Sequence, residues 1–171
     1  RRNDVVVLPL VPVTPSTWSS SVGRPKNSSA AGAIAARALA TRSWGTAAPT
    51  ERVSVDATGG DADGWSDMPS ITADGRYVAF MSYGSDLVAG DTNSQGDVFL
   101  RDRQNGTTEL VSVDSNEVQG NGWSFQPFVS SDGRYVAFTS DATNLVSGDG
   151  NGTRDVFIRD RQTGTTERVS Q

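Results

Sequence analysis

The chain has 171 residues and a formal net charge of −5, and it contains neither Cys nor His. The lack of Cys and His excludes disulfides, thiol nucleophiles, the common zinc sites and every hydrolytic triad that needs an imidazole. No apolar run approaches the roughly 20 residues that a membrane-spanning helix needs, so we expect no membrane span.

Residues 1–50 differ in charge from the rest of the chain. They contain six Arg and Lys residues against Asp4 alone, a net charge of +5, which leaves −10 for residues 51–171. Opposite charges of this size predict a basic N-terminal arm that contacts an acidic body, in the same or a neighbouring subunit. A disordered basic leader is the alternative.

The arm begins with an apolar, β-branched segment that is interrupted by Pro9 and Pro12. Proline cannot donate a hydrogen bond to a neighbouring strand, so the segment is expected to be an edge strand or an extended ligand on another sheet edge. Because an exposed apolar edge promotes aggregation, we expect pairing with another subunit. The Ala-rich stretch 29–40 is expected to be a short helix or ordered coil. The predicted assembly residues are Val5, Val6, Val7, Leu8, Leu10, Val11 and Val13.

The rest of the chain is a tandem duplication with a period of 58 residues. The segment 74–80 returns letter for letter as 132–138, and residues 51–108 match residues 109–166 with 32 identities and no gap. A repeat of this kind cannot bury its apolar face alone. We therefore expect an arm at 1–50, a first unit at 51–108, and a second unit at 109–171 that includes a closing strand.

Each copy contains four predicted strands. Asp-Gly turns at 73–75 and 131–133 predict tight hairpins with Gly at positive φ, and the strand after each turn is apolar enough to be buried on both faces. Four antiparallel strands at a fixed period predict an all-β fold made of two four-stranded antiparallel β-propeller-type blades. The predicted strands are 68–72, 76–82, 97–101 and 107–113, then 126–130, 134–140 and 155–159, with 51–55 and 167–170 as further copies of the fourth strand.

The repeats resemble the TolB-like, PD40 (WD40-like) propeller family. The resemblance covers both repeats and none of the arm. It implies a scaffold used for protein docking, for ligand binding or as a lid on peptidases, and so does not settle function. It is carried by Trp65-Ser with Pro69, Trp123-Ser with Pro127, both Asp-Gly-Arg-Tyr-Val-Ala-Phe strands and both Asp-Val-Phe-(Leu/Ile)-Arg-Asp strands.

Two blades do not close a ring, because propellers typically have about four to eight. The chain is therefore expected to form a composite ring with other copies, to stack into a filament, or to be part of something longer. Both ends of the repeat region carry a copy of the fourth strand. This arrangement favours head-to-tail contact, which gives a ring if the rotation closes and a fibre if it does not.

The loop after the second strand predicts a calcium site in each repeat. Its spacing Asp-x-Asn-x-x-x-Asp resembles the first half of an EF-hand loop and the loops of calcium propellers, and oxygen ligands without His or Cys favour calcium over transition metals. No bidentate Glu follows in the loop, and Asx-turns are the alternative. The predicted ligands are Asp91, Asn93, Gln95 and Asp97, and Asp149, Asn151, Thr153 and Asp155.

An acidic, aromatic surface is expected beside these loops, because the loops before the first strand and after the second strand lie on one face of a propeller. Such a surface would suit sugars that stack on Trp, but a blade Trp is more often packed between blades. Asp61, Asp63 and Trp65 are expected near the Asp91 loop, and Asn121 and Trp123 near the Asp149 loop.

These patterns predict a structural, self-assembling extracellular protein, a homo-oligomer or filament with calcium-stabilised loops. The alternative is a multi-chain or fragmentary propeller that binds glycans or docks proteins. The single Lys and the abundant Asn, Gly, Ser and Thr are typical of exported bacterial proteins. The acidic body argues against nucleic acid as a partner, and carboxylates repeated identically in each unit argue against an enzyme.

Overall fold

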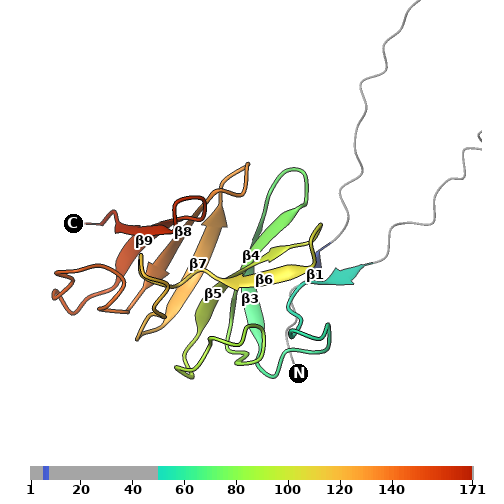
Figure 1. Cartoon of the computed structure of the whole chain (residues 1–171), viewed down its shortest axis with the longest axis horizontal. Coiled ribbons are helices and arrows are strands. Elements are labelled where there is room, and N and C mark those ends of the chain that lie inside the picture. The colour runs from blue at the N-terminus through green and yellow to red at the C-terminus, as the bar shows by residue number, and fades with distance from the viewer. Residues whose placement is uncertain (1–5, 8–49, 171) are drawn as a thin grey trace, which may run out of the picture.

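The computed structural model describes residues 6–7 and 50–170, and these residues form an all-β structure. They contain two four-stranded antiparallel sheets, which lie side by side in Figure 1, and none of them is helical. The Ala-rich stretch 29–40 lies outside the described residues. The first sheet has β3 (Ser66–Ile71), β4 (Tyr77–Ser82), β5 (Asp97–Asp102) and β6 (Thr107–Leu110); the second has β7 (Ser124–Val129), β8 (Tyr135–Ser140), β9 (Asp155–Asp160) and β10 (Thr165–Arg168).

The hairpin turns follow from the Asp-Gly pairs. Asp74 accepts hydrogen bonds from the Thr72 hydroxyl at 2.6 Å and from the Arg76 amide at 3.0 Å. Gly75 then adopts a φ of 72°, and Gly133 adopts 73° at the equivalent position, a left-handed conformation that glycine reaches without steric cost. Each turn directs the chain straight back into the second strand. That strand is buried on both faces in the first sheet, as predicted, but on only one face in the second sheet, where the prediction was wrong because the described residues do not cover the other face.

The first strand of each sheet carries a β-bulge at the same place. The pairing register shifts between Asp67 and Ser70 in β3, and again between Phe125 and Phe128 in β7. A bulge bends a strand and increases its twist. Because the bulge recurs 58 residues later, it belongs to the repeat and shapes both inner strands alike.

The apolar core has two parts. Val53, Val78 and Phe80 belong to a cluster on one side of the first sheet. Ala79 and Phe138 belong to a second cluster that joins the two sheets. The strand β4 therefore has both faces buried, as its apolar sequence predicted. The second cluster is the part of the core that the two sheets share.

A short two-stranded sheet precedes the first blade. It pairs β1 (Val6–Val7) with β2 (Glu51–Arg52), Val6 opposite Arg52 and Val7 opposite Glu51. In the first sheet, Phe99 and Leu100 stand opposite Leu110 and Glu109. A shift of 58 residues places 51 and 52 on 109 and 110, so β1 and β2 pair in the register of β5 and β6.

The position of β2 beside the first sheet also follows the repeat. Arg103 donates to the Glu51 carboxylate at 2.6 Å, and Arg161 is paired with Glu109 in the equivalent way. The β1–β2 pair therefore reproduces the two outer strands of a blade placed before the first one. This pairing is within one chain, and the predicted assembly residues 5, 8, 10, 11 and 13 lie outside the described residues.

No helix among the described residues is long and apolar enough to cross a membrane.

Candidate functional site

The contact between the two sheets is built from one face of the first sheet and the inner strand of the second. The strand β7 lies across β3, β4 and β5, and Val98 and Leu100 are buried in the shared cluster. Tyr77 closes this contact, because a Cβ added at Gly133 would lie 2.2 Å from its ring. Arg161 covers the same ring, 4.8 Å from its centroid.

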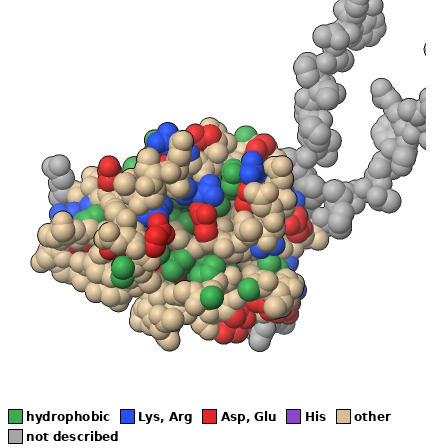
Figure 2. Space-filling model, viewed as in Figure 1, with side chains coloured by type: hydrophobic (Ala, Val, Ile, Leu, Met, Phe, Trp, Pro, Cys, Tyr) green, Lys and Arg blue, Asp and Glu red, His purple; other side chains and the backbone are tan. Residues whose placement is uncertain are grey.

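The same face of the second sheet is left uncovered by the described residues. Val98 and Val111 are 0% and 1% exposed, whereas their equivalents Val156 and Val169 are 39% and 49% exposed. Figure 2 shows hydrophobic side chains gathered near the middle of the molecule, where the two sheets meet. We call the uncovered surface the outer face, and it comprises Tyr135, Ala137, Thr139, Val156, Ile158 and Val169.

The first sheet leaves the complementary half of the contact exposed. In β7, Pro127 is buried and Val129 is packed against the shared cluster. Their equivalents in β3, Pro69 and Ile71, are exposed. We call this region, together with Trp65, the β3 surface. Within residues 50–170 the interblade contact therefore occurs once, and each of the two sheets presents one unmatched half of it.

A row of aromatic rings crosses the interblade contact. The ring centroids are 4.9 Å apart for Trp65 and Tyr83, 6.1 Å for Tyr83 and Trp123, and 5.0 Å for Trp123 and Phe125, and the rings of each pair are tilted. Trp123 also lies directly over Gly96, where an added Cβ would be 2.4 Å from the indole nitrogen. Trp123 was predicted beside the Asp149 loop, but it packs against the Asp91 loop because β7 crosses onto the first sheet.

We call the bare backbone at Gly96, against which Trp123 packs, the seat for this tryptophan. The second repeat has a different residue at this position. The equivalent residue is Arg154, which pairs with Asp141 at 2.8 Å and lies 4.2 Å from the ring centroid of Phe125. A tryptophan that docked on the second sheet as Trp123 docks on the first would therefore meet a guanidinium instead of a bare backbone.

The polar members of the predicted ligand face mainly hold loops together. Asp61 is paired with Arg52. Asp63 accepts from the Ser85 amide at 2.7 Å, and Asn121 accepts from the Thr143 amide at 2.8 Å. These bonds join the loop before each first strand to the loop after each second strand, so the two loops lie on one face as expected. Trp65 is the most exposed aromatic ring of the predicted face, at 42%.

The loop of the first repeat brings two predicted ligands into a buried pair. Asp97 is fully buried and Asp91 nearly so. A single group joins them: the Gln119 amide nitrogen donates to Asp91 Oδ1 at 2.8 Å and to Asp97 Oδ2 at 2.9 Å. Ser112 donates to the other Asp97 oxygen at 2.5 Å. Asn93 donates to the Gly120 carbonyl at 2.8 Å, so it lies at the same junction.

The loop of the second repeat has the same pair but a different bridging group. Arg168 Nη1 donates to Asp149 Oδ1 at 2.8 Å and to Asp155 Oδ2 at 3.5 Å. Ser170 takes the place of Ser112, donating to Asp155 Oδ1 at 2.5 Å. Asp149 Oδ2 is buried and has no hydrogen-bond partner among the described residues. Asn151 donates to Asp155 Oδ2 at 2.8 Å.

The two remaining predicted ligands, Gln95 and Thr153, take part in their loops through their backbone amides and not through their side chains. The amide of Gln95 donates to Asn93 Oδ1 at 2.7 Å, and the amide of Thr153 donates to Asn151 Oδ1 at 2.9 Å. Both side chains are exposed. Each loop therefore contains the Asx-turn that was the alternative to a calcium site, and the turn is compatible with the carboxylate pair beside it.

The two pairs differ in electrostatics. Burial raises the pKa of Asp97 to about 6, and the neighbouring charge of Asp91 acts in the same direction, against the hydrogen bond from Ser112. The pKa of the equivalent Asp155 is lowered, first by the Ser170 hydroxyl and then by Asn151. Hydrogen bonds and nearby charges therefore stabilise the ionised carboxylate of Asp97 less than that of Asp155.

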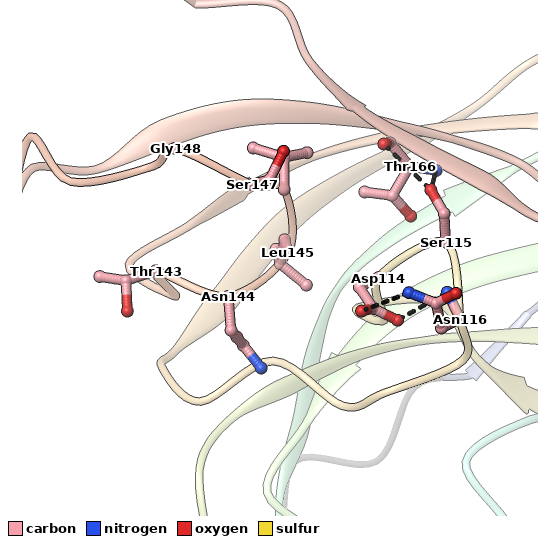
Figure 3. A pocket seen from close by; sticks show the side chains of 10 residues that line it. Asp114, Ser115, Asn116, Thr143, Asn144, Leu145, Ser147, Gly148 and Thr166 are labelled. Atoms are coloured by element: carbon pink, nitrogen blue, oxygen red, sulfur yellow. Dashed lines mark hydrogen bonds between the residues drawn. The ribbon is translucent and has the colours of Figure 1, made fainter.

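A polar pocket of about 590 Å³ lies between the loops of the second repeat (Figure 3). Its one carboxylate, Asp114, is occupied by its own loop, accepting from the Asn116 amide at 2.7 Å and the Val118 amide at 2.8 Å. A pocket of about 530 Å³ recurs between the corresponding loops of the first repeat, around Asp56 and Leu87. Because it recurs with the repeat, we attribute the pocket to blade architecture.

Sequence reasoning missed Gln119, Arg168 and the seat at Gly96. The signal for the seat was present: repeat alignment sets Gly96 against Arg154, a large difference inside an otherwise similar loop. Gln119 and Arg168 are separated from their carboxylates by one or more strands, so only the folded sheet brings them together.

No family model matches the sequence, and a search of curated proteins finds no match. Among solved structures, the chain is similar to a protein described as TolB from Agrobacterium tumefaciens, with 20% sequence identity and a TM-score of 0.43. The match covers 71% of this chain and 37% of that one.

Proposed function

We propose that this chain is a structural, self-assembling module in which the outer face of one copy docks on the β3 surface of the next. The observation that carries the proposal is the difference in exposure between Val98 and Val156, which are equivalent in the repeat but 0% and 39% exposed. The contact within the chain shows what can cover such a face, because β7 covers the equivalent face of the first sheet. A second copy offers the equivalent strand β3 with Pro69 and Ile71 exposed.

Head-to-tail contact of this kind uses different patches on the two copies, so it can repeat. Repetition gives a closed ring or an open filament, depending on the rotation between copies. The β1–β2 pair lies where the two outer strands of a preceding blade would lie, so this pair must move aside when another copy docks on the β3 surface. An extracellular, bacterial location remains a prediction from composition.

Sedimentation velocity of the full chain over a range of concentrations tests this function. We expect concentration-dependent species heavier than one chain, and the limiting mass distinguishes a ring from a filament. A single species with the mass of one chain at all concentrations would contradict the proposal.

The variant Arg154→Gly is expected to strengthen association. Trp123 packs against Gly96 of the first sheet, and this variant places glycine at the equivalent position of the second sheet. Trp65 of another copy can then pack there in the same way. An aromatic contact of this kind contributes ~1 kcal/mol, and we expect a decrease in the association Kd of about fivefold. An unchanged or increased Kd, with the thermal midpoint of each chain unchanged, would show that Arg154 does not occupy the docking seat.

A second candidate function is favoured by the exposure of Trp65. Its ring is 42% exposed and backed by Tyr83, an arrangement that suits stacking against a sugar, so a lectin-like binding module is the alternative. Binding on a glycan array that is lost in Trp65→Ala would support it. No binding by the native chain would rule it out.

A further inference from the structure

The two carboxylate pairs show that the repeat places a donor group at one defined position. Gln119 Nε2 and Arg168 Nη1 come from different elements, yet each contacts the same two oxygens, Oδ1 of the first Asp and Oδ2 of the second. In the second repeat this donor carries a full positive charge. The fold therefore already holds a cation between Asp149 and Asp155.

The acceptor capacity of the pair exceeds what the arginine satisfies. Asp149 Oδ2 is buried with no hydrogen-bond partner among residues 6–7 and 50–170, although Arg168 bonds the other oxygen of the same carboxylate. A buried carboxylate oxygen without a partner is costly. A spherical cation can contact both oxygens of a carboxylate, which the planar guanidinium does not do here.

The first repeat has the acidic pair without the positive charge. In the described part of the chain, no Lys or Arg forms an ion pair with Asp91 or Asp97. The groups that donate to these carboxylates are neutral, and they belong to Gln119, Ser112 and Asn93. Two neighbouring carboxylates that are buried without a counter-charge destabilise a fold, so this position favours a cation more strongly than its equivalent.

The surrounding atoms define the kind of cation. Asn93 and Gln119 are the amide side chains nearest the two carboxylates, their oxygens accept from the Gln95 and Thr92 amides, and the chain contains no His or Cys, so the side chains around the pair offer oxygen ligands and no sulfur or imidazole. Oxygen ligands of this type are preferred by hard divalent cations. We propose that the first repeat binds one Ca²⁺ between Asp91 and Asp97 in place of the Gln119 amide nitrogen, and that Arg168 is a built-in counter-charge that fills the equivalent position in the second repeat.

Calorimetric titration of the full chain with CaCl₂ tests this assignment. We expect one site per chain. Asp97→Asn should weaken binding at least tenfold, whereas Asp155→Asn, the matched change in the second repeat, should leave the stoichiometry and affinity unchanged. The absence of binding at millimolar Ca²⁺, two equal sites in the native chain, or equal losses in the two variants would overturn the proposal.

Arg168→Leu provides the decisive variant, and it is expected to fold. It places at 168 the residue that the first repeat has at 110, and the Arg168 side chain is 28% exposed. Removing the guanidinium frees the second pair, so the stoichiometry should rise from one to two. A stoichiometry that stays at one would overturn the role assigned to Arg168, whether or not Asp97→Asn folds.

Discussion

Replacing Phe138 by Ala should lower the free energy of unfolding by ~3–5 kcal/mol. Phe138 is 1% exposed, stacks on Phe157 with ring centroids 5.8 Å apart, and belongs to the cluster that joins the two sheets. The removed ring would leave a cavity at the interblade contact. Urea denaturation followed by tryptophan fluorescence measures the loss.

The control for this change is Phe128→Ala. Phe128 lies on β7 but is 70% exposed, so its removal should change the free energy of unfolding by no more than ~0.5 kcal/mol. A loss below about 1 kcal/mol for Phe138→Ala would contradict a shared core. Two separate unfolding transitions in the native chain would likewise show that the sheets fold independently.

The variant Val156→Asp should abolish association between copies. Val156 lies on the outer face and is 39% exposed, so a carboxylate is tolerated in the single chain but would be buried without a partner on docking. This burial costs several kcal/mol, and we expect the association Kd to rise at least a hundredfold. Sedimentation equilibrium of the variant measures the change.

Val118→Asp is the matched control, because Val118 is 53% exposed but lies in the loop before β7, away from the outer face. It introduces the same charge and should leave Kd unchanged. Equal weakening in both variants would assign the effect to net charge. An unchanged Kd in Val156→Asp would remove the outer face from the interface.

The strands were largely predictable because the sequence repeats itself. Predicted strands at 76–82 and 97–101 correspond to β4 (Tyr77–Ser82) and β5 (Asp97–Asp102), since their apolar pattern and the turns beside them, Asp-Gly before β4 and Asn-Gly after β5, act locally. The first strand begins at Ser66, two residues before its prediction. The bulge at Met68, whose φ is 53°, allows the strand to continue around Pro69.

The relation between the two sheets was less predictable. Equivalent faces of the two repeats have different exposures, as Val98 and Val156 show, because the exposure of a face depends on what covers it as well as on its own sequence. The register of β1 against β2 was also missed. Its signal is Asp4-Val-Val-Val7, which resembles Asp97-Val-Phe-Leu100 at the start of β5.

The candidate cation site was only half predictable. Spacing alone selected Asp91 and Asp97, and the fold brings them together as a buried pair. The same spacing selected Asp149 and Asp155, but a guanidinium from β10 lies between them. The loop sequence therefore could not distinguish the two sites, because each bridging group lies outside its loop, Gln119 after β6 and Arg168 on β10.

The head-to-tail contact between copies is tested most directly by disulfide trapping with two single-cysteine variants, Ile71→Cys and Phe128→Cys. The native chain has no Cys, and both residues are exposed. In the interblade contact the Val129 amide donates to Ser70 Oγ at 3.1 Å, and the repeat places Ile71 and Phe128 in the same relation between copies. Our account predicts a cross-linked two-chain product when the variants are mixed and oxidised. Cross-linking of Phe128→Cys with itself alone, or no product in the mixture, would contradict it.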